Sequence, residues 1–346
     1  MSRTRAAHFS VAGVSTCVPP RVFDNLERAS DFGEVAVRKV VAMAGVRWRH
    51  LVEPGVTATD LCFEAAVALL DQLGWERESI TGLIMVTQSP DYLLPSSSCM
   101  AHKWLGLSSD CASFDVGLGC SSYPYGLYLA ATMLQAGGQG RILLLNGETP
   151  SLFTDPDDHA TTLLFGDAGS ATALEFNDQA APAFFTLHTD GSGYDGLIVR
   201  GGGYRDRYPK NTRDNFLSMD GAAVFNFTIK RVPALIRETL EFSGLGVQDI
   251  EAYLFHQSNQ FMMKHLINKA GLPLERTPLI LDRFGNCGGP AVPLALTQGR
   301  GAAPPPQGRI MALGYGVGLS WGAAVFNLAA NAPILHGEYS GQLPRG

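Results

Sequence analysis

The sequence is poor in the features that mark nucleic-acid-binding, metal-binding and membrane-spanning proteins. Only 17% of the 346 residues are charged, the formal net charge is −6, and basic residues are scattered, so a nucleic-acid partner is not expected. No two cysteines have the C-x-x-C spacing of a structural zinc site, so we expect no metal. No uninterrupted apolar run is long enough to cross a bilayer, so no membrane span is expected either.

The chain also lacks the marks of a secreted protein. Its N-terminal segment contains arginines but no long apolar core, and we interpret it as leading into a first strand rather than as a signal peptide. Six cysteines are present, but a chain of this length can build a core without disulfides. We therefore expect free thiols in a cytoplasmic protein, with Cys62, Cys99 and Cys111 in the core.

What the chain does contain is a pattern that occurs twice. Segments 68–89 and 238–258 both read as a helix, a glycine, a polar loop and an apolar strand. The segments GRILLLNG from Gly140 and GRIMALGYG from Gly308 repeat at nearly the same offset. Two echoes at one spacing favour an internal duplication. We predict an N-terminal half, residues 1–176, and a C-terminal half, residues 177–346.

Within each half, short apolar runs alternate with helical patterns. Such runs are typical of strands buried on both faces, with helices covering both sides of each sheet, and they predict an α/β fold. A Gly-rich, charged segment at 188–215 is interpreted as the long connection between the halves. The expected strands are Gly82–Thr87, Ser113–Val116, Arg141–Asn146, Ser170–Phe176, Ala252–His256, Leu279–Asp282, Arg309–Leu313 and Ala323–Leu328.

Cys120 lies where an expected strand turns into an apolar helix, within the sequence Gly-Leu-Gly-Cys-Ser-Ser. The start of a helix carries unpaired N–H groups and partial positive charge, and both favour a thiolate over a thiol. The flanking glycines allow a substrate to approach the backbone closely. This position predicts a reactive nucleophile rather than a core cysteine.

Polar residues also occur at strand ends in the second half. His256 ends an expected strand and takes the place that the core residue Val86 has in the first copy, with Asn259 three residues further on. Asn286 lies in a glycine-rich turn, and segment 312–326, ALGYGVGLSWGAAVF, provides a loop whose amides can bind an oxyanion. A purely structural, hydrogen-bonded role for His256 remains an alternative from these residues alone.

The order Cys…H-Q-x-N…G-N…G-x-G-x-G-x-S-W-G resembles the β-ketoacyl-acyl-carrier-protein synthase III family of the thiolase superfamily, over nearly the whole chain. The resemblance implies a thiolase-like, five-layered αβαβα fold built from two duplicated halves, and a homodimer. It implies no cofactor, with acyl-CoA or acyl-carrier-protein thioesters as substrates. An acyl carrier protein is accordingly a candidate partner.

The same resemblance assigns roles to individual residues. Cys120 would be the nucleophile with His256 and Asn286 as its partners, and the amides of Cys120 and Val317 would hold the oxyanion. The residues expected to bind substrate are Leu94 (reaching in from the other subunit), Phe165, Phe225, Asn259 and Arg47.

The entrance departs from the pattern of the family. Met43 stands where an arginine is expected, no tryptophan precedes it, and His159 replaces a second arginine. Phe261 replaces the arginine that docks the carrier protein. Because the catalytic trio is kept while the entrance differs, we expect a specialised relative, in secondary-metabolite or surface-polysaccharide biosynthesis, rather than the enzyme that starts bulk fatty-acid biosynthesis.

Three functions remain open at this point. The first is decarboxylating condensation of an acyl group on Cys120 with a malonyl-type thioester, giving a 3-oxoacyl product. The second is acyl transfer to an oxygen or nitrogen of a small molecule, with His256 as general base. The third is a cysteine hydrolase or an inactive partner subunit. Asn286, a neutral hydrogen-bond donor suited to an enolate, favours condensation.

Overall fold

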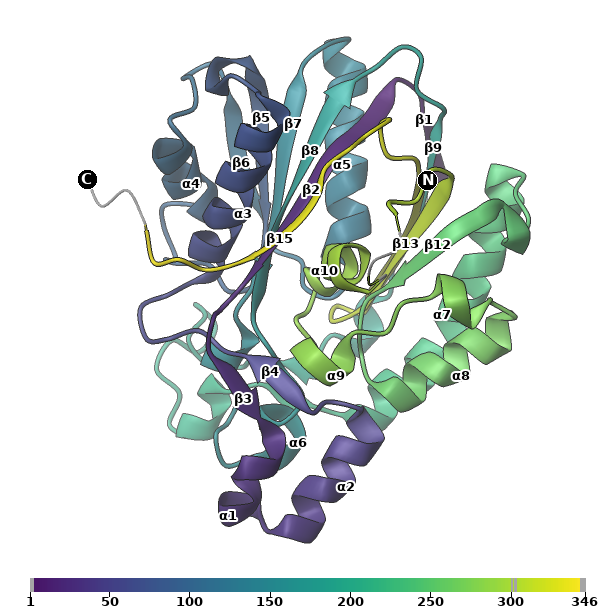
Figure 1. Ribbon diagram of the computed structural model, residues 1–346. Coiled ribbons are helices and arrows are strands. Elements are labelled where there is room, and N and C mark those ends of the chain that lie inside the picture. The colour runs from purple at the N-terminus through teal and green to yellow at the C-terminus, as the bar shows by residue number, and fades with distance from the viewer. Residues whose placement is uncertain (1–2, 300, 302–303, 343–346) are drawn as a thin grey trace.

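Two mixed β-sheets with helices between and outside them form the framework of the computed structural model, which describes residues 3–299, 301 and 304–342 (Figure 1). The first sheet has the order β15 (Ile334–Glu338), β2 (Phe9–Val18), β8 (Ala168–Phe176), β7 (Arg141–Glu148), β5 (Ile80–Val86) and β6 (Ala112–Val116). The second has the order β1 (Arg3–Ala6), β9 (Ala183–Thr189), β14 (Ser320–Phe326), β13 (Arg309–Gly316) and β12 (Ile250–Phe255).

The two sheets repeat one topology. In the first, β2 pairs antiparallel with β8, β8 antiparallel with β7, and β7 parallel with β5. In the second, β9, β14, β13 and β12 pair in the same order with the same directions. The outermost strands are exchanged, because β1 joins the second sheet and β15 joins the first. The boundary at 176/177 falls between β8 and β9 and stays a prediction.

The helices complete five layers. Helices α3 (Ala58–Leu73) and α4 (Ser97–Leu105) cover the outer face of the first sheet. Helices α5 (Ser122–Gly137) and α10 (Ala291–Gln298) lie between the two sheets and contact strands of both (Figure 1). Helix α7 (Gly221–Ser243) covers the outer face of the second sheet, and α8 (Gln260–Ala270) packs against α7. This arrangement confirms the five-layered αβαβα expectation.

Smaller elements extend below the sheets in Figure 1 and close one side of the middle layer. They include α1 (Ala29–Phe32), α2 (Glu34–Ala44), α6 (His159–Thr162), α9 (Leu281–Phe284) and the two-stranded sheets β3 (Val22–Asp24) with β4 (Trp48–His50) and β10 (Leu197–Ile198) with β11 (Ser218–Met219). The short 3₁₀ helices are Asn25–Arg28, Arg77–Ser79, Pro150–Leu152, Gly191–Gly193, Thr212–Asn215, Val247–Asp249 and Leu274–Arg276.

One expected strand, Leu279–Asp282, is wrong. This segment leads into the short helix α9, and no strand pairs with the free edge of β12 among the described residues. The backbone of this segment is hydrogen-bonded by the side-chain amide of Gln257 instead of by a neighbouring strand. The amide nitrogen donates to Pro278 O (3.2 Å), and the amide oxygen accepts from Ile280 N (3.0 Å). The other expected strands are confirmed, with ends shifted by a few residues.

Two further expectations need correction. The segment 188–215 does not connect the halves, because the chain crosses between the sheets at the short β8–β9 connection. It begins in β9, includes β10 and ends just before β11, all within the second half. Cys99 is not a core residue either: it lies on the solvent side of α4, while Cys62 and Cys111 are buried.

The fold brings several strand ends together. Strands β5, β6 and β7 are parallel, so their carboxyl ends meet at one edge of the first sheet, and β12 and β13 do the same in the second. The start of α5 follows β6, and the turn before α10 lies beside it in the middle layer. Among the described helices, none has the length and the apolar character needed to cross a bilayer.

Candidate active site

Cys120 lies in the turn between β6 and α5, two residues before the helix begins. The turn is closed by a hydrogen bond from Ser122 N to Gly119 O (2.9 Å). Opposite the cysteine runs the end of β13, where Gly316 has φ +152°. A Cβ at position 316 would lie 2.7 Å from Cys120 Cβ and 3.0 Å from Cys120 Sγ. Only glycine therefore leaves room for the thiol at this point.

The electrostatics of the thiol differ from the sequence-based expectation. Burial raises the pKa of Cys120 to about 11, although backbone N–H groups of Val317 and of Cys120 itself hydrogen-bond the sulfur and oppose this rise. Desolvation of the thiolate outweighs the favourable helix start. Burial thus favours the protonated thiol of Cys120, and an attack by this sulfur on a substrate would require a proton acceptor.

His256 provides such an acceptor. It follows β12 directly, and its backbone N–H donates to Leu313 O at 2.7 Å. Its Nδ1 lies 2.9 Å from Gly288 O, and because a carbonyl only accepts, Nδ1 must carry the proton. Burial lowers the pKa of His256 to about 4, so the ring is neutral and Nε2 presents a lone pair. The ring also packs edge-on against Tyr315, with centroids 5.4 Å apart.

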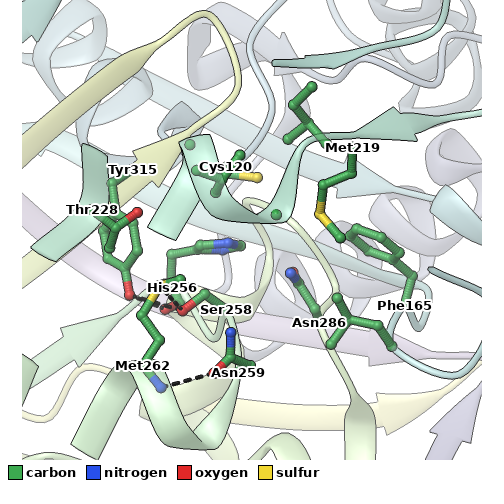
Figure 2. A pocket seen from close by; sticks show the side chains of 15 residues that line it. Cys120, Phe165, Met219, Thr228, His256, Ser258, Asn259, Met262, Asn286 and Tyr315 are labelled. Atoms are coloured by element: carbon green, nitrogen blue, oxygen red, sulfur yellow. Dashed lines mark hydrogen bonds between the residues drawn. The ribbon is translucent and has the colours of Figure 1, made fainter. Parts of the chain in front are cut away.

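Asn286 is held by a strand-like contact and by its own turn. Its N–H donates to Leu164 O (2.9 Å), and its C=O accepts from Gly166 N (3.2 Å). Its side-chain Oδ1 accepts from Gly288 N at 3.0 Å, which leaves Nδ2 as a free donor. Figure 2 shows this nitrogen and the His256 ring facing the side of the pocket where Cys120 lies.

Cys120, His256 and Asn286 line one cavity of about 100 Å³ (Figure 2). The structure thus brings together the three residues that the sequence analysis singled out. The other walls are Leu164, Phe165, Leu197, Met219, Gly221, Val224, Thr228, Ser258, Asn259, Met262, Tyr315 and Gly316. A second, more apolar cavity reaches Cys120 from the other side and is lined by Gln88, Gly119, Glu148, Pro150, Phe153, Phe165, Leu197, Leu217, Gly288 and Val317.

The residues expected to bind substrate are distributed unevenly. Phe165 borders both cavities beside Cys120. Asn259 lines the first cavity, but its side-chain oxygen caps α8 by accepting from Met262 N at 2.8 Å. Phe225 lies at the outer mouth, in a separate cavity that shares Leu164 and Asn259 with the first.

The remaining two expected residues lie outside these cavities. The guanidinium of Arg47 is ion-paired with Asp24 and lies over the Trp48 ring, 5.3 Å from its centroid. Leu94 is 75% exposed and lines none of the described cavities of its own chain. Its expected place in the tunnel of another subunit stays a prediction.

The two cavities that Cys120 lines are together called the reaction chamber. The sequence analysis did not identify two residues that line it. Tyr315 donates to His256 O (3.1 Å) and so supports the histidine from behind. Glu148 ends β7 and is almost fully buried beside Cys120. A signal for Glu148 was available, because a charged residue closes an otherwise apolar strand in LLLNGE. Within the described part of the chain, no group of three or more His, Cys, Asp or Glu side chains could hold a metal.

The fold defines a class, the thiolase-fold proteins, and the cavity adds a cysteine, a histidine and an asparagine that line it together. Residues 114–191 match the family model for 3-oxoacyl-(acyl-carrier-protein) synthase III, and residues 240–328 match the model for its C-terminal part. A curated relative, the putative 3-oxoacyl-(acyl-carrier-protein) synthase 3 of Campylobacter jejuni, is 33% identical over 94% of this chain and 95% of its own. The chain therefore belongs to the 3-oxoacyl-(acyl-carrier-protein) synthase III family, whose members are transferases.

Solved structures agree with this assignment. The chain is similar to a 3-oxoacyl-(acyl-carrier-protein) synthase from Burkholderia xenovorans, with 38% identity and a TM-score of 0.93, covering 97% of this chain and 98% of that one. It is also similar to the priming β-ketosynthase of the R1128 polyketide pathway, with 27% identity and a TM-score of 0.83, covering 93% of this chain and 97% of that one.

The close approach at Gly316 gives a first prediction. Gly316→Ala should lower the rate of Cys120 acylation by about 100-fold. The new methyl group would push the Cys120 sulfur out of position, and a shift of about 1 Å has an effect of this size. Intact-mass spectrometry with an acyl thioester measures the rate. Gly137→Ala, at the end of α5 with open space around it, is the matched control and should acylate normally. Normal acylation of both variants would contradict this reading of the site.

Proposed function

We propose that the protein loads an acyl group from a thioester onto Cys120 and condenses it with a malonyl-type thioester, releasing carbon dioxide and a 3-oxoacyl product. The observation that carries the proposal is the fixed orientation of Asn286. Its oxygen is tied to Gly288, so its amide nitrogen is a donor in the cavity that Cys120 and the neutral His256 also line. A neutral donor beside a nucleophile suits an enolate, whose charge a carboxylate in that place would repel.

In the first step, the Cys120 proton passes to Nε2 of His256 while the sulfur attacks the thioester carbonyl carbon. The N–H groups of Cys120 and Val317, which hydrogen-bond the sulfur, would hold the developing oxyanion, and their place beside the sulfur supports this role. The bond to the leaving sulfur then breaks, and that sulfur takes the proton back from His256. Acylation thus leaves the histidine neutral.

In the second step, the malonyl carboxylate leaves as carbon dioxide, and Asn286 Nδ2 donates to the enolate oxygen. His256 can donate as well only when Nε2 carries a proton, because Nδ1–H is committed to Gly288 O. We propose that this proton is taken up from solvent as the enolate charge forms. The enolate carbon attacks the acyl group, and the proton ends on the released Cys120 sulfur. Carbon, sulfur and proton all balance in this sequence.

The lone pair on His256 Nε2 also supports a second candidate. A neutral imidazole with a free Nε2 could equally deprotonate an alcohol or amine, and the acyl group would then pass from Cys120 to oxygen or nitrogen. This reading leaves the inward donor of Asn286 without a task, and we therefore rank it second. An inactive partner subunit is disfavoured because the cavity retains all three reactive residues. A cysteine hydrolase is disfavoured because the two like α/β halves and the loop in segment 312–326 have no place in it.

The mouth of the site supports a carrier-bound thioester as donor, with no cofactor. The described residues that line it are Val40, Met43, Ala44, Ala160, Leu164, Phe225, Asn259 and Phe261, none of them charged. Arg47 is engaged with Asp24, and His159 is exposed beside Phe32 rather than in this lining. The phosphates of coenzyme A accordingly find no cation there. A specialised pathway and a cytoplasmic location remain predictions.

The donor pair can be tested by separating the two half-reactions. Cys120→Ala should still release carbon dioxide from a malonyl thioester, because decarboxylation needs the donors and not the nucleophile. Asn286→Ala should lower that release by about 10²–10³-fold and leave acylation of Cys120 largely intact. Labelled malonyl thioester and intact mass provide the two readouts. If malonyl thioesters are never decarboxylated while acyl groups reach an alcohol or amine, the second candidate is correct.

The entrance can be tested by comparing donors. Cys120 of the wild-type protein should be acylated at least about tenfold faster by an acyl group bound to an acyl carrier protein than by the same acyl group bound to coenzyme A, with both donors at the same low concentration. Met43→Arg should narrow this difference by placing a cation among the mouth residues. Val35→Arg, on the same helix and 84% exposed outside the mouth, is the control. Equal use of both donors by the wild-type protein would refute the proposed entrance.

A homodimer is the third test. The edge strand β6 is only half-buried, and Tyr92, Leu93 and Leu94 are all exposed. An apolar cavity of about 490 Å³ near Val317 shares Leu197 and Leu217 with the chamber. We expect sedimentation to show a dimer in which Leu94 of a second copy lies at this cavity. The larger side chain in Leu94→Trp should then slow the loading of an octanoyl group onto Cys120 more than the loading of an acetyl group. Leu274→Trp, also exposed, is the control. An active monomer would contradict the arrangement.

A further inference from the structure

The buried side chain of Glu148 lies against both sides of the reaction chamber, with its carboxyl group at the turn after β5 and its methylene groups at Gly288, and has no role in the steps above. Its Oε1 accepts from Gln88 N (2.9 Å) and its Oε2 accepts from the Ser89 hydroxyl (3.0 Å). Ser89 Oγ in turn accepts from Thr149 N (3.0 Å). These contacts tie the end of β7 to the turn after β5, on the side of the chamber where the nucleophile lies.

The turn after β5 bears directly on the position of Cys120. The side chain of Gln88 lies against Gly119, where a Cβ would come within 2.4 Å of its Oε1 and 3.0 Å of Val317 Cγ1. Gly119 directly precedes Cys120, and the backbone N–H of Val317 is one of the two that hydrogen-bond the Cys120 sulfur. A displaced Gln88 would therefore change the place of the thiol and of one oxyanion donor together.

On the other side, Glu148 packs against the turn that carries Asn286 and that His256 contacts through Gly288. A Cβ at Gly288 would lie 3.0 Å from Glu148 Cγ, so the two residues pack closely. Gly288 accepts from His256 Nδ1 and donates to Asn286 Oδ1. The position of the Glu148 side chain thus reaches the histidine and the asparagine through a single backbone unit.

The charges around Glu148 disfavour its ionised form. The acidic groups that face it are Cys120 at the start of α5, Asp167 just before β8, and Cys62 on α3, whose own pKa the charge of Glu148 raises. Burial raises the pKa of Glu148 to about 8, against the opposing effect of its two hydrogen bonds, and Cys120 and Asp167 raise it further. The carboxyl group is accordingly mostly protonated at neutral pH.

We propose that Glu148 is a positioning residue that holds the nucleophile side and the donor side of the chamber together as a neutral acid. In this form it sets the distance between the Gln88 turn and Gly288 without adding a negative charge beside the thiolate or the enolate. Ionisation would place a charge next to Cys120 and hold the thiol protonated. The expected effect of Glu148 on condensation rests on the proposed function. Its expected effect on the pKa of the Cys120 thiol does not.

The test compares Glu148→Gln, which keeps the shape and is permanently neutral, with the wild-type protein. Iodoacetamide alkylation of Cys120, followed on its peptide by mass spectrometry, reports the thiolate fraction as a function of pH. Above pH 8 the wild-type rate should rise less than tenfold per pH unit, because Glu148 ionises over the same range. The Gln variant should be alkylated about threefold to tenfold faster at pH 9, as expected for a thiol pKa lower by half a unit to one unit.

The malonyl reaction gives a second readout. Carbon dioxide release should fall more steeply in the wild-type protein than in the Gln variant as pH rises through about 8. Glu148→Ala, which removes the contact with Gly288, should lower release at every pH. Glu175→Gln is the matched control, since Glu175 lies near the end of β8 and pairs with Arg141 at 3.8 Å, and its profiles should follow the wild type.

The outcomes separate cleanly. The proposal would be overturned if Glu148→Gln showed the same pH profiles of alkylation and carbon dioxide release as the wild-type protein. It would also be overturned if Glu148→Gln were not acylated at any pH, because the carboxylate form would then be required. If the Gln variant fails to fold, carbon-13 NMR of glutamate-labelled wild-type protein decides, because a side-chain carboxyl resonance titrating near pH 8 is expected and its absence refutes the idea. If malonyl thioesters are not decarboxylated at all, the proposed condensation fails while the alkylation result still stands.

Discussion

The backbone of Gly288 holds the side chains of His256 and Asn286, which line one cavity with Cys120, in a single unit. Its carbonyl accepts from His256 Nδ1 and its N–H donates to Asn286 Oδ1, so one peptide segment sets the tautomer of the histidine and the direction of the amide. With φ +66°, the position favours glycine, and the close contact with Glu148 leaves no space for a side chain. The rest of the site is arranged around this turn, which precedes α10 between the two sheets.

The chamber is kept free of charge until a substrate arrives. Burial raises the pKa of the Cys120 thiol and of the Glu148 carboxyl group and lowers that of the His256 imidazole, so all three are neutral in the empty site near pH 7. In a region of low dielectric, each charge that forms during the reaction interacts strongly with the dipoles fixed around it. In the proposed reaction, the thiolate of Cys120 forms by proton transfer to His256 and is not present beforehand.

Much of this could be predicted from the sequence. The repeated helix–loop–strand segments predicted two like units, and the apolar runs between helical patterns predicted most strands because the side-chain pattern of a buried strand is local. Cys120, His256 and Asn286 were recognised by their residue types and by glycine-rich turns at strand ends. The errors arose where non-local partners decide. The strand expected at Leu279–Asp282 is replaced by α9, because the Gln257 side chain bonds the backbone that a ladder would otherwise use.

The sequence by itself predicted most of the strands and helices, because their patterns are local, and through the family resemblance it singled out Cys120, His256 and Asn286, which line one cavity. Only the tertiary structure decided the protonation of the site and the role of Glu148. The helix start at Cys120 favours a thiolate locally, but the surrounding layers remove water and reverse that preference. Likewise the sequence marks Glu148 only as a charged residue that closes an apolar strand and does not show what it contacts. This residue becomes a link between Gln88 and Gly288 only because β5, β7 and the turn before α10 converge in space, and no pattern along the chain encodes that convergence.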